Sequence, residues 1–151
     1  MSTDQLSPNA WLLDFGQGFH AAVGTRVLLQ LIDQPCLHQV PCTPPHCQNV
    51  LRWQGKLLPV MDMAALLGGA PLSVNLLAVA AYQDKPADST RFVAFRLASP
   101  PAAIIVGDEQ SCALPVHPSV WAKFAISCFG HRGEAIPIPN LERIFSAISE
   151  P

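Results

Sequence analysis

The chain contains an internal repeat, and this repeat limits the architectures that it can adopt. The segment WQGKLLPVMDMAALL, which begins at Trp53, matches the segment HRGEAIPIPNLERIF, which begins at His131. Each copy predicts a tight turn at glycine, a strand that contains proline, and then a short helix. Chance similarity between two turn-and-strand segments is the alternative. The positions that agree in size and polarity are Gly55 with Gly133, Leu58 with Ile136, Pro59 with Pro137, Val60 with Ile138, Asp62 with Asn140, Met63 with Leu141, Leu66 with Ile144 and Leu67 with Phe145.

Both copies carry a signal for the start of a helix. Asp62 and Asn140 stand where an N-cap side chain accepts hydrogen bonds from free backbone N–H groups. The apolar residues that follow each of them are spaced to form one face of a helix. Gly68 is expected to end the first helix, and the second is expected to continue to about Ile148.

The remaining pattern predicts a mainly β protein. Fifteen prolines in 151 residues are about twice the usual share of roughly 5%, and proline interrupts helices. With the repeat, this predicts two small β-barrels in one chain, with a short helix after each repeat unit. We expect residues 1–9 to be a disordered lead and the barrels to span about 10–70 and 71–151, with strands free to cross that boundary. Further strand-like runs lie at residues 11–15, 19–23, 75–82, 91–97 and 102–106.

Composition excludes several classes of function. Only 13% of the residues are charged, against about 25% in an ordinary domain, so apolar surface should remain for a partner. A net charge of −2 without any basic run argues against nucleic-acid binding. The longest uncharged span, residues 63–83, is broken by glycine and proline, so we expect no insertion into a membrane. An odd number of cysteines, five, without an export signal predicts reduced thiols in the cytoplasm.

The sequence carries no motif of a known catalytic site, and we predict no enzyme and no cofactor. Hydrolase elbows, phosphate loops, dinucleotide turns and zinc-protease motifs are missing from it. Cys112 and Cys128 lie in apolar, strand-like surroundings and are interpreted as inert core thiols. One alternative remains, a metal site in a loop whose spacing fits no standard pair of ligands. Its candidate ligands are Cys36, His38, Cys42, His46 and Cys47.

Residues 41–68, PCTPPHCQNVLRWQGKLLPVMDMAALLG, resemble the signature of CheW-like domains. A proline-containing loop leads into a strand, a corner at glycine and a hydrophobic-Pro-hydrophobic-x-Asp ending. FHAAVGTRVLLQLI and AISCFGHRGEAIPIPNLERIF resemble the second strand of the family with its following connection, and its C-terminal strand pair with helix. The resemblance implies two packed five-stranded barrels. It also implies a non-catalytic adaptor that couples chemoreceptor tips to a histidine kinase whose regulatory domain shares the fold.

The resemblance also implies where partners bind. The turn after the first strand of the motif would be the recognition edge. Independently of the resemblance, Arg132 is a further candidate contact, because it lies beside the turn of the second copy. Asn49 replaces a usual glycine and tolerates the left-handed backbone that glycine adopts. Gln54 replaces a usual arginine that would pair with a receptor carboxylate, so Arg52 or Lys56 would have to supply the charge. The expected edge consists of Asn49, Arg52, Trp53, Gln54, Gly55 and Lys56.

The sequence therefore predicts a cytoplasmic adaptor of a bacterial chemosensory complex. Its partners would be the regulatory domain of a CheA-like histidine kinase and the cytoplasmic tip of a chemoreceptor. Trp53, which resembles a residue of twitching-motility adaptors, is expected to be partly exposed, with burial in the core as the alternative. Besides the metal site, the alternative function is a degenerate relative that associates only with itself. The stimulus and the motile output stay open.

Overall fold

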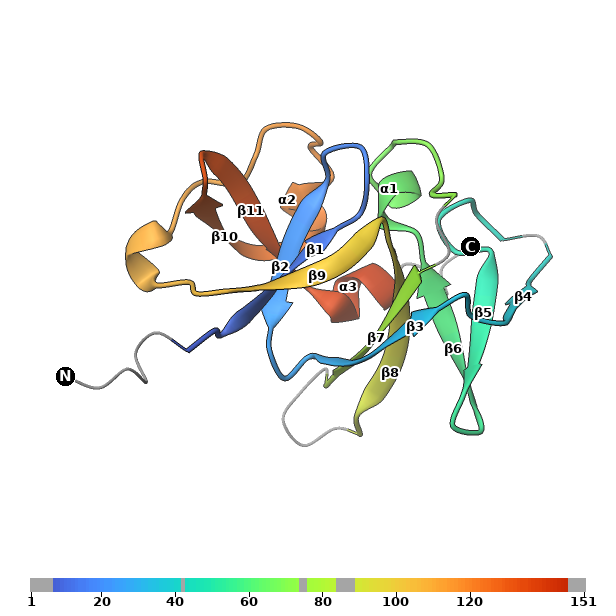
Figure 1. Ribbon diagram of the computed structural model, residues 1–151. Coiled ribbons are helices and arrows are strands. Elements are labelled where there is room, and N and C mark those ends of the chain that lie inside the picture. Colours follow the sequence, from blue (N-terminus) through green and yellow to red (C-terminus); the bar gives the residue numbers. More distant parts are fainter. Residues whose placement is uncertain (1–6, 42, 74–75, 84–88, 147–151) are drawn as a thin grey trace.

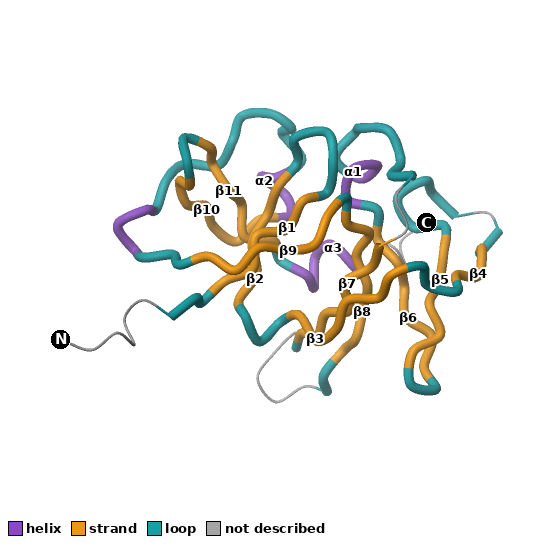
Figure 2. The backbone as a smooth tube through the Cα atoms, viewed as in Figure 1, coloured by secondary structure: helices purple, strands orange, loops and turns teal. Residues whose placement is uncertain are grey.

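The structure, a computed structural model, describes residues 7–41, 43–73, 76–83 and 89–146. It is mainly β, and its helices are short (Figures 1 and 2). Two lobes of strands lie side by side, with α3 (Leu141–Ser146) between them (Figure 1). The expectation of two packed β subdomains, each with a helix after its repeat unit, is confirmed, but the second has six strands where the resemblance implied five.

The first lobe joins a three-stranded sheet, in the order β2-β1-β9, to a two-stranded hairpin. Strand β11 packs beside β2, and Ala22, Phe129 and Ile136 form a small buried cluster between the sheet and the hairpin. The strands are β1 (Ala10–Asp14), β2 (His20–Gly24), β9 (Ser99–Ile104), β10 (Ala125–His131) and β11 (Glu134–Pro139).

The second lobe is one six-stranded sheet in the order β3-β7-β8-β6-β5-β4. All its neighbouring strands are antiparallel except β6 and β8, which are parallel and pair only at Val60 with Ala94 and Met61 with Phe95. Its inner face is lined by a cluster that includes Leu51, Leu58 and Val79. The strands are β3 (Leu28–Asp33), β4 (Leu37–Gln39), β5 (Asn49–Trp53), β6 (Lys56–Met61), β7 (Leu76–Tyr82) and β8 (Arg91–Leu97).

The two lobes do not divide the chain near residue 70. Strands β3 to β8 all belong to the second lobe, while β1 and β2 belong with β9, β10 and β11. The cause is the pairing of strands that are distant in sequence. Ala10 of β1 pairs with Ile104 of β9, so the sheet that contains β1 is completed by a strand from the far half of the chain. The second lobe is accordingly one continuous stretch, and the first lobe is assembled from both ends.

The two copies of the repeat adopt the same local structure. In β5–β6 the turn residues Gln54 and Gly55 have φ values of 49° and 77°, and in β10–β11 Arg132 and Gly133 have 50° and 79°. Positive φ at both central residues is the geometry of a tight hairpin turn. Short helices follow both hairpins, α1 (Met63–Leu66) and α3. Ile148, where the second helix was expected to end, lies outside the described residues.

A shared core fills the space between the lobes. Phe95 of β8 lies 6.0 Å from Phe15 and 5.3 Å from Phe145 of α3, measured between ring centroids. Trp121 of α2 (Trp121–Phe124) is buried in the same cluster. No helix in the described ranges has the length and apolar character needed to span a lipid bilayer.

Candidate functional site

The predicted recognition edge lies at the tip of the β5–β6 hairpin. Trp53 and Lys56 are the last paired residues, and Gln54 and Gly55 form the turn between them. Gln54, Gly55 and Lys56 are exposed, and Trp53 is half-buried. The hairpin tip thus presents polar side chains around one large aromatic ring.

Trp53 is held by the inner face of the second lobe. Its indole N–H donates to Oε1 of Gln30 on β3, at 2.9 Å from nitrogen to oxygen. Its ring lies 5.4 Å from the ring of Phe92 on β8, and the ammonium of Lys56 lies 4.2 Å from the Phe92 ring centre. The hydrogen bond from Trp53 to Gln30 therefore joins β5 to β3, two strands that are not neighbours in the sheet.

The opposite face of this hairpin is open. Arg52 and Leu57 are directly opposed residues of β5 and β6, so their side chains leave the same face. Both are exposed, and Leu57 is 64% exposed. Leu57 was not predicted as a site residue, although the inward positions of Leu58 and Val60 would have placed it outside by alternation.

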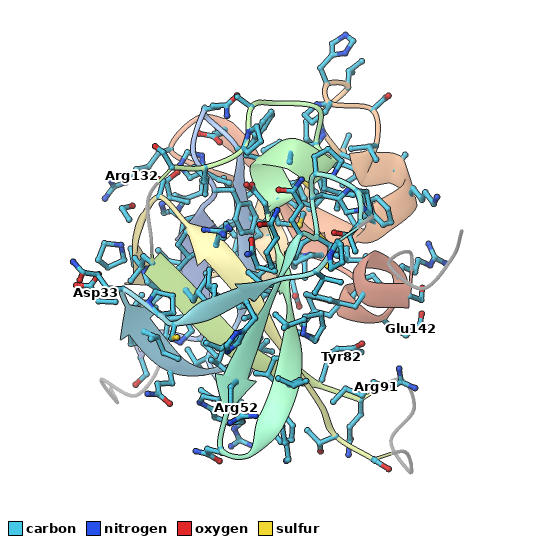
Figure 3. The ribbon with its side chains drawn as sticks, turned by 90° about the vertical axis from the view of Figure 1, so that its right-hand side faces the viewer. Asp33, Arg52, Tyr82, Arg91, Arg132 and Glu142 are labelled. Carbon is cyan, nitrogen blue, oxygen red and sulfur yellow. The ribbon has the colours of Figure 1, made fainter. Side chains whose placement is uncertain are left out.

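A groove of about 330 Å³ adjoins this face. It opens where β6 and β8 diverge from their short parallel contact, and it continues to Tyr82 of β7 and Phe145 of α3. Figure 3 shows Arg52 near the hairpin tip, with Arg91 and Tyr82 beyond it toward Glu142. The floor is apolar and the rim carries the cations Lys56 and Arg91. We call Arg52, Leu57 and this groove the hairpin face.

Asn49 has a different role from the predicted one. The four non-glycine residues with positive φ in the described ranges are Gln17, Gln34, Gln54 and Arg132, so the expectation of a left-handed Asn49 is wrong. Asn49 instead opens β5, and its amide oxygen accepts a hydrogen bond of 2.9 Å from Arg96 of β8. The ladder position gives Asn49 an extended backbone, and its side chain anchors the base of the hairpin.

Arg132 occupies a separate place. It forms the turn of the β10–β11 hairpin in the first lobe, whereas Arg52 lies on the second lobe. The two labelled arginines lie far apart in Figure 3. The predicted interaction residues therefore form two sites, one at each hairpin.

The residues of the cysteine-rich and histidine-rich loop are dispersed. Cys36 and His38 are exposed, whereas Cys47 is buried, and burial raises the pKa of its thiol. Burial also lowers the pKa of His46. Cys42 lies outside the described residues. Within the described ranges, no three histidine, cysteine or acidic side chains are grouped so that they could hold a metal ion.

Two side-chain clusters were not anticipated from the sequence. Nδ1 of His20 on β2 lies 3.0 Å from Oε2 of Glu134 on β11, which joins the two sheets of the first lobe. The thiols of Cys112 and Cys128 lie 3.5 Å apart. Neither pair is close in sequence, so only the tertiary fold brings its members together.

Comparison with known proteins agrees with the fold described above. The structure matches that of the scaffolding protein TtCheW from Thermoanaerobacter tengcongensis with a TM-score of 0.69 and 11% sequence identity, over 88% of this chain and 89% of that one. Among curated proteins, no sequence matches this chain at a significant level. The family model of the CheW-like domain matches residues 20–117, which is more than half of the chain. The chain therefore belongs to the CheW-like domain family.

Proposed function

We propose that the protein is a non-catalytic adaptor in a bacterial chemosensory complex of the cytoplasm, where its hairpin face binds the regulatory domain of a CheA-like histidine kinase. The observation that carries this proposal is the exposed pair of Arg52 and Leu57 on a hairpin whose other face is fixed in the sheet. A rigid surface of this kind loses little conformational entropy when a partner covers it. Its mechanism is association, with no bond made or broken.

The chemistry of the hairpin face suits a partner with an apolar centre and an acidic border. Leu57 would supply buried apolar area, and full burial of a leucine is worth about 1.5–3 kcal/mol. Arg52 and Arg91 at the border would add orientation and a faster encounter with a negatively charged partner. Trp53 supports this face from inside the lobe through Gln30 and Phe92.

Titration calorimetry of the full chain against the kinase regulatory domain tests the proposal. We expect saturable binding that Leu57→Ser weakens about ten-fold or more, the equivalent of about 1.4 kcal/mol. Ile126→Ser is the matched control, because Ile126 is 67% exposed on β10 of the other lobe. Equal losses for the two variants, or none for Leu57→Ser, would contradict the proposed face.

The contribution of charge is tested separately. Arg52→Ala should weaken kinase binding, whereas Arg26→Ala should not, since Arg26 is an exposed arginine just before β3. The effect of Arg52→Ala should shrink as salt is raised, because exposed charges are screened. Trp53 is unsuitable for this test, because its loss would disturb the inner face of the lobe.

In this proposal, the turn at Gln54 and Gly55 is the part of the protein that binds a chemoreceptor tip. Gln54 carries no charge, so its side chain offers only neutral hydrogen bonds to a receptor carboxylate. Gln54→Arg should therefore raise affinity for a receptor cytoplasmic tip and leave kinase affinity unchanged. Receptor affinity that Gln54→Arg leaves unaltered would show that the turn does not make this contact.

A further inference from the structure

The thiol pair of Cys112 and Cys128 is set by backbone pairing. Ser111 and Phe129 form an isolated antiparallel bridge, and the backbone N–H of Cys112 donates to the carbonyl of Cys128 at 3.1 Å. The two cysteines therefore face each other across two adjacent segments, and their sulfur atoms lie 3.5 Å apart. A disulfide bond requires about 2.0 Å, so a small shift of either side chain would close the gap.

The two thiols differ in access to solvent. Cys112 is exposed and follows η2 (Asp108–Gln110), on the connection between β9 and α2. Cys128 is buried within β10. Burial, and after it the contact with Cys112, raises the pKa of Cys128 to about 12. Cys128 therefore rests as a protonated thiol, and Cys112 is the sulfur that a dissolved reagent meets first.

We propose that Cys112 and Cys128 are a redox modification site, which forms a reversible disulfide by exchange with glutathione disulfide. Cys112 is the entry point and Cys128 is the resolving thiol. This inference goes beyond the adaptor function and does not depend on it. Cys36, exposed on a different loop, provides a comparison within the same chain.

The exchange has two balanced steps. The Cys112 thiolate attacks one sulfur of glutathione disulfide, so that a bond from Cys112 to glutathione forms, the S–S bond of the reagent breaks and one glutathione leaves. Cys128 then gives its proton to the departed glutathione thiolate and attacks the Cys112 sulfur, which releases a second glutathione. Two protein thiols are oxidised to a disulfide, and one glutathione disulfide is reduced to two molecules of glutathione.

The disulfide would fix the connecting segment to the β10–β11 hairpin. This segment is already attached there by the hydrogen bond from the Gln110 side chain to the carbonyl of Gly130, at 3.1 Å. A covalent link would replace this weak attachment and close a short ring that contains α2. Such a ring restricts the unfolded chain and so favours the folded one.

Tryptic mapping of the wild-type chain tests the proposal directly. Cleavage after Arg96, Lys123 and Arg132 puts Cys112 and Cys128 on separate peptides, 97–123 and 124–132, while the other cysteines fall together on peptide 27–52. After incubation with glutathione disulfide, we expect the two peptides to appear joined and to separate on reduction. The oxidised protein should also melt roughly 5–10 °C higher than the reduced protein.

Single variants assign the two roles. Cys128→Ser should keep glutathione on Cys112, because no resolving thiol is left to displace it. Cys112→Ser should leave Cys128 unmodified, and Cys36→Ser should form the joined peptides as the wild type does. The proposal is overturned if the wild type keeps both thiols free, or if it carries glutathione on Cys112 without joined peptides. Faster modification of Cys128 than of Cys112 would overturn the assignment of the entry point.

Discussion

Gln54 and Arg132 are residues with ordinary L side chains in left-handed backbone, one at the turn of each repeat unit. This conformation costs such residues roughly 1–2 kcal/mol, and asparagine tolerates it better. The glycine that follows each of them adopts the second positive φ of the turn without this cost. Each hairpin thus keeps a strained, exposed residue in its turn.

Gln54→Asn should raise the free energy of unfolding by about 0.5–1 kcal/mol, because asparagine before glycine is the preferred pair in this turn. Urea unfolding monitored by circular dichroism measures the change. Gln54→Val is the opposite control, since a β-branched side chain should be strained there and lower stability. A destabilised Gln54→Asn variant would mean that the Gln54 side chain makes a stabilising contact of its own.

Single residues also show which features could be predicted from the sequence and which could not. The turns at Gly55 and Gly133 could be predicted because only local backbone geometry decides them. The hydrogen bond between Trp53 and Gln30, by contrast, joins strands that are distant in sequence. The pairing of Cys112 with Cys128 depends in the same way on tertiary contacts, so local composition suggested only inert thiols.

At the scale of elements, the two N-cap side chains differ in the number of backbone N–H groups that they bind. Oδ1 of Asp62 accepts from the backbone N–H of Ala65 at 3.3 Å, and Oδ2 accepts from that of Leu72 at 2.8 Å. Oδ1 of Asn140 accepts from the backbone N–H of Arg143 alone among the described bonds, at 3.2 Å. Asp62 is also buried, at 5% exposure. It therefore fixes both the start of α1 and the segment that follows the helix.

Asp62→Ala should cost about 2–3 kcal/mol of unfolding free energy, because two backbone N–H groups lose their acceptor. Asn140→Ala, the matched change in the second copy, should cost about 1 kcal/mol. Chemical denaturation of both variants measures the difference. Equal costs would indicate that the bond to Leu72 adds no stability.

The prediction of elements was most accurate where turn residues bound a strand on both sides. Strand β8 was expected at residues 91–97 and is found at Arg91–Leu97. Strand β3 (Leu28–Asp33) was interpreted as part of the connection after the second strand, because residues 19–32 resemble that part of the family. Leu29 and Leu31 are exposed on this strand, so the expectation that large apolar residues are buried does not identify it. Strand β9 begins at Ser99 despite two prolines, which an outer strand of a sheet can tolerate.

At the scale of the whole molecule, the lobes are joined by more than their common core. The side chain of Gln17, at the β1–β2 corner, donates to the carbonyl of Ala70 at 2.6 Å and accepts from its N–H at 3.1 Å. Asp14 of β1 accepts through its backbone carbonyl from the N–H of Ala98, at the end of β8. These bonds and the Phe95 cluster tie both lobes into one structural unit.

We therefore expect the lobes to unfold in a single transition. Fluorine-labelled tryptophan allows each lobe to be followed by NMR, because Trp121 lies in the shared core beside the first lobe and Trp53 lies in the second. Both signals should lose their native intensity at the same urea concentration. Phe95→Ala, which removes the ring between Phe15 and Phe145, should shift both signals together and cost about 3–5 kcal/mol. Separate midpoints would show that the lobes are independent.

The pairing of β1 with β9 has a consequence for the order in which the protein forms during synthesis. All six strands of the second lobe lie between Leu28 and Leu97, so they leave the ribosome as one uninterrupted set. The hairpin of β1 and β2 emerges before them, yet its partners β9, β10 and β11 are translated after them. A nascent chain would therefore carry a finished second lobe and an uncovered N-terminal hairpin. That hairpin, with its apolar inner face, is the segment for which a chaperone would have the longest time to bind.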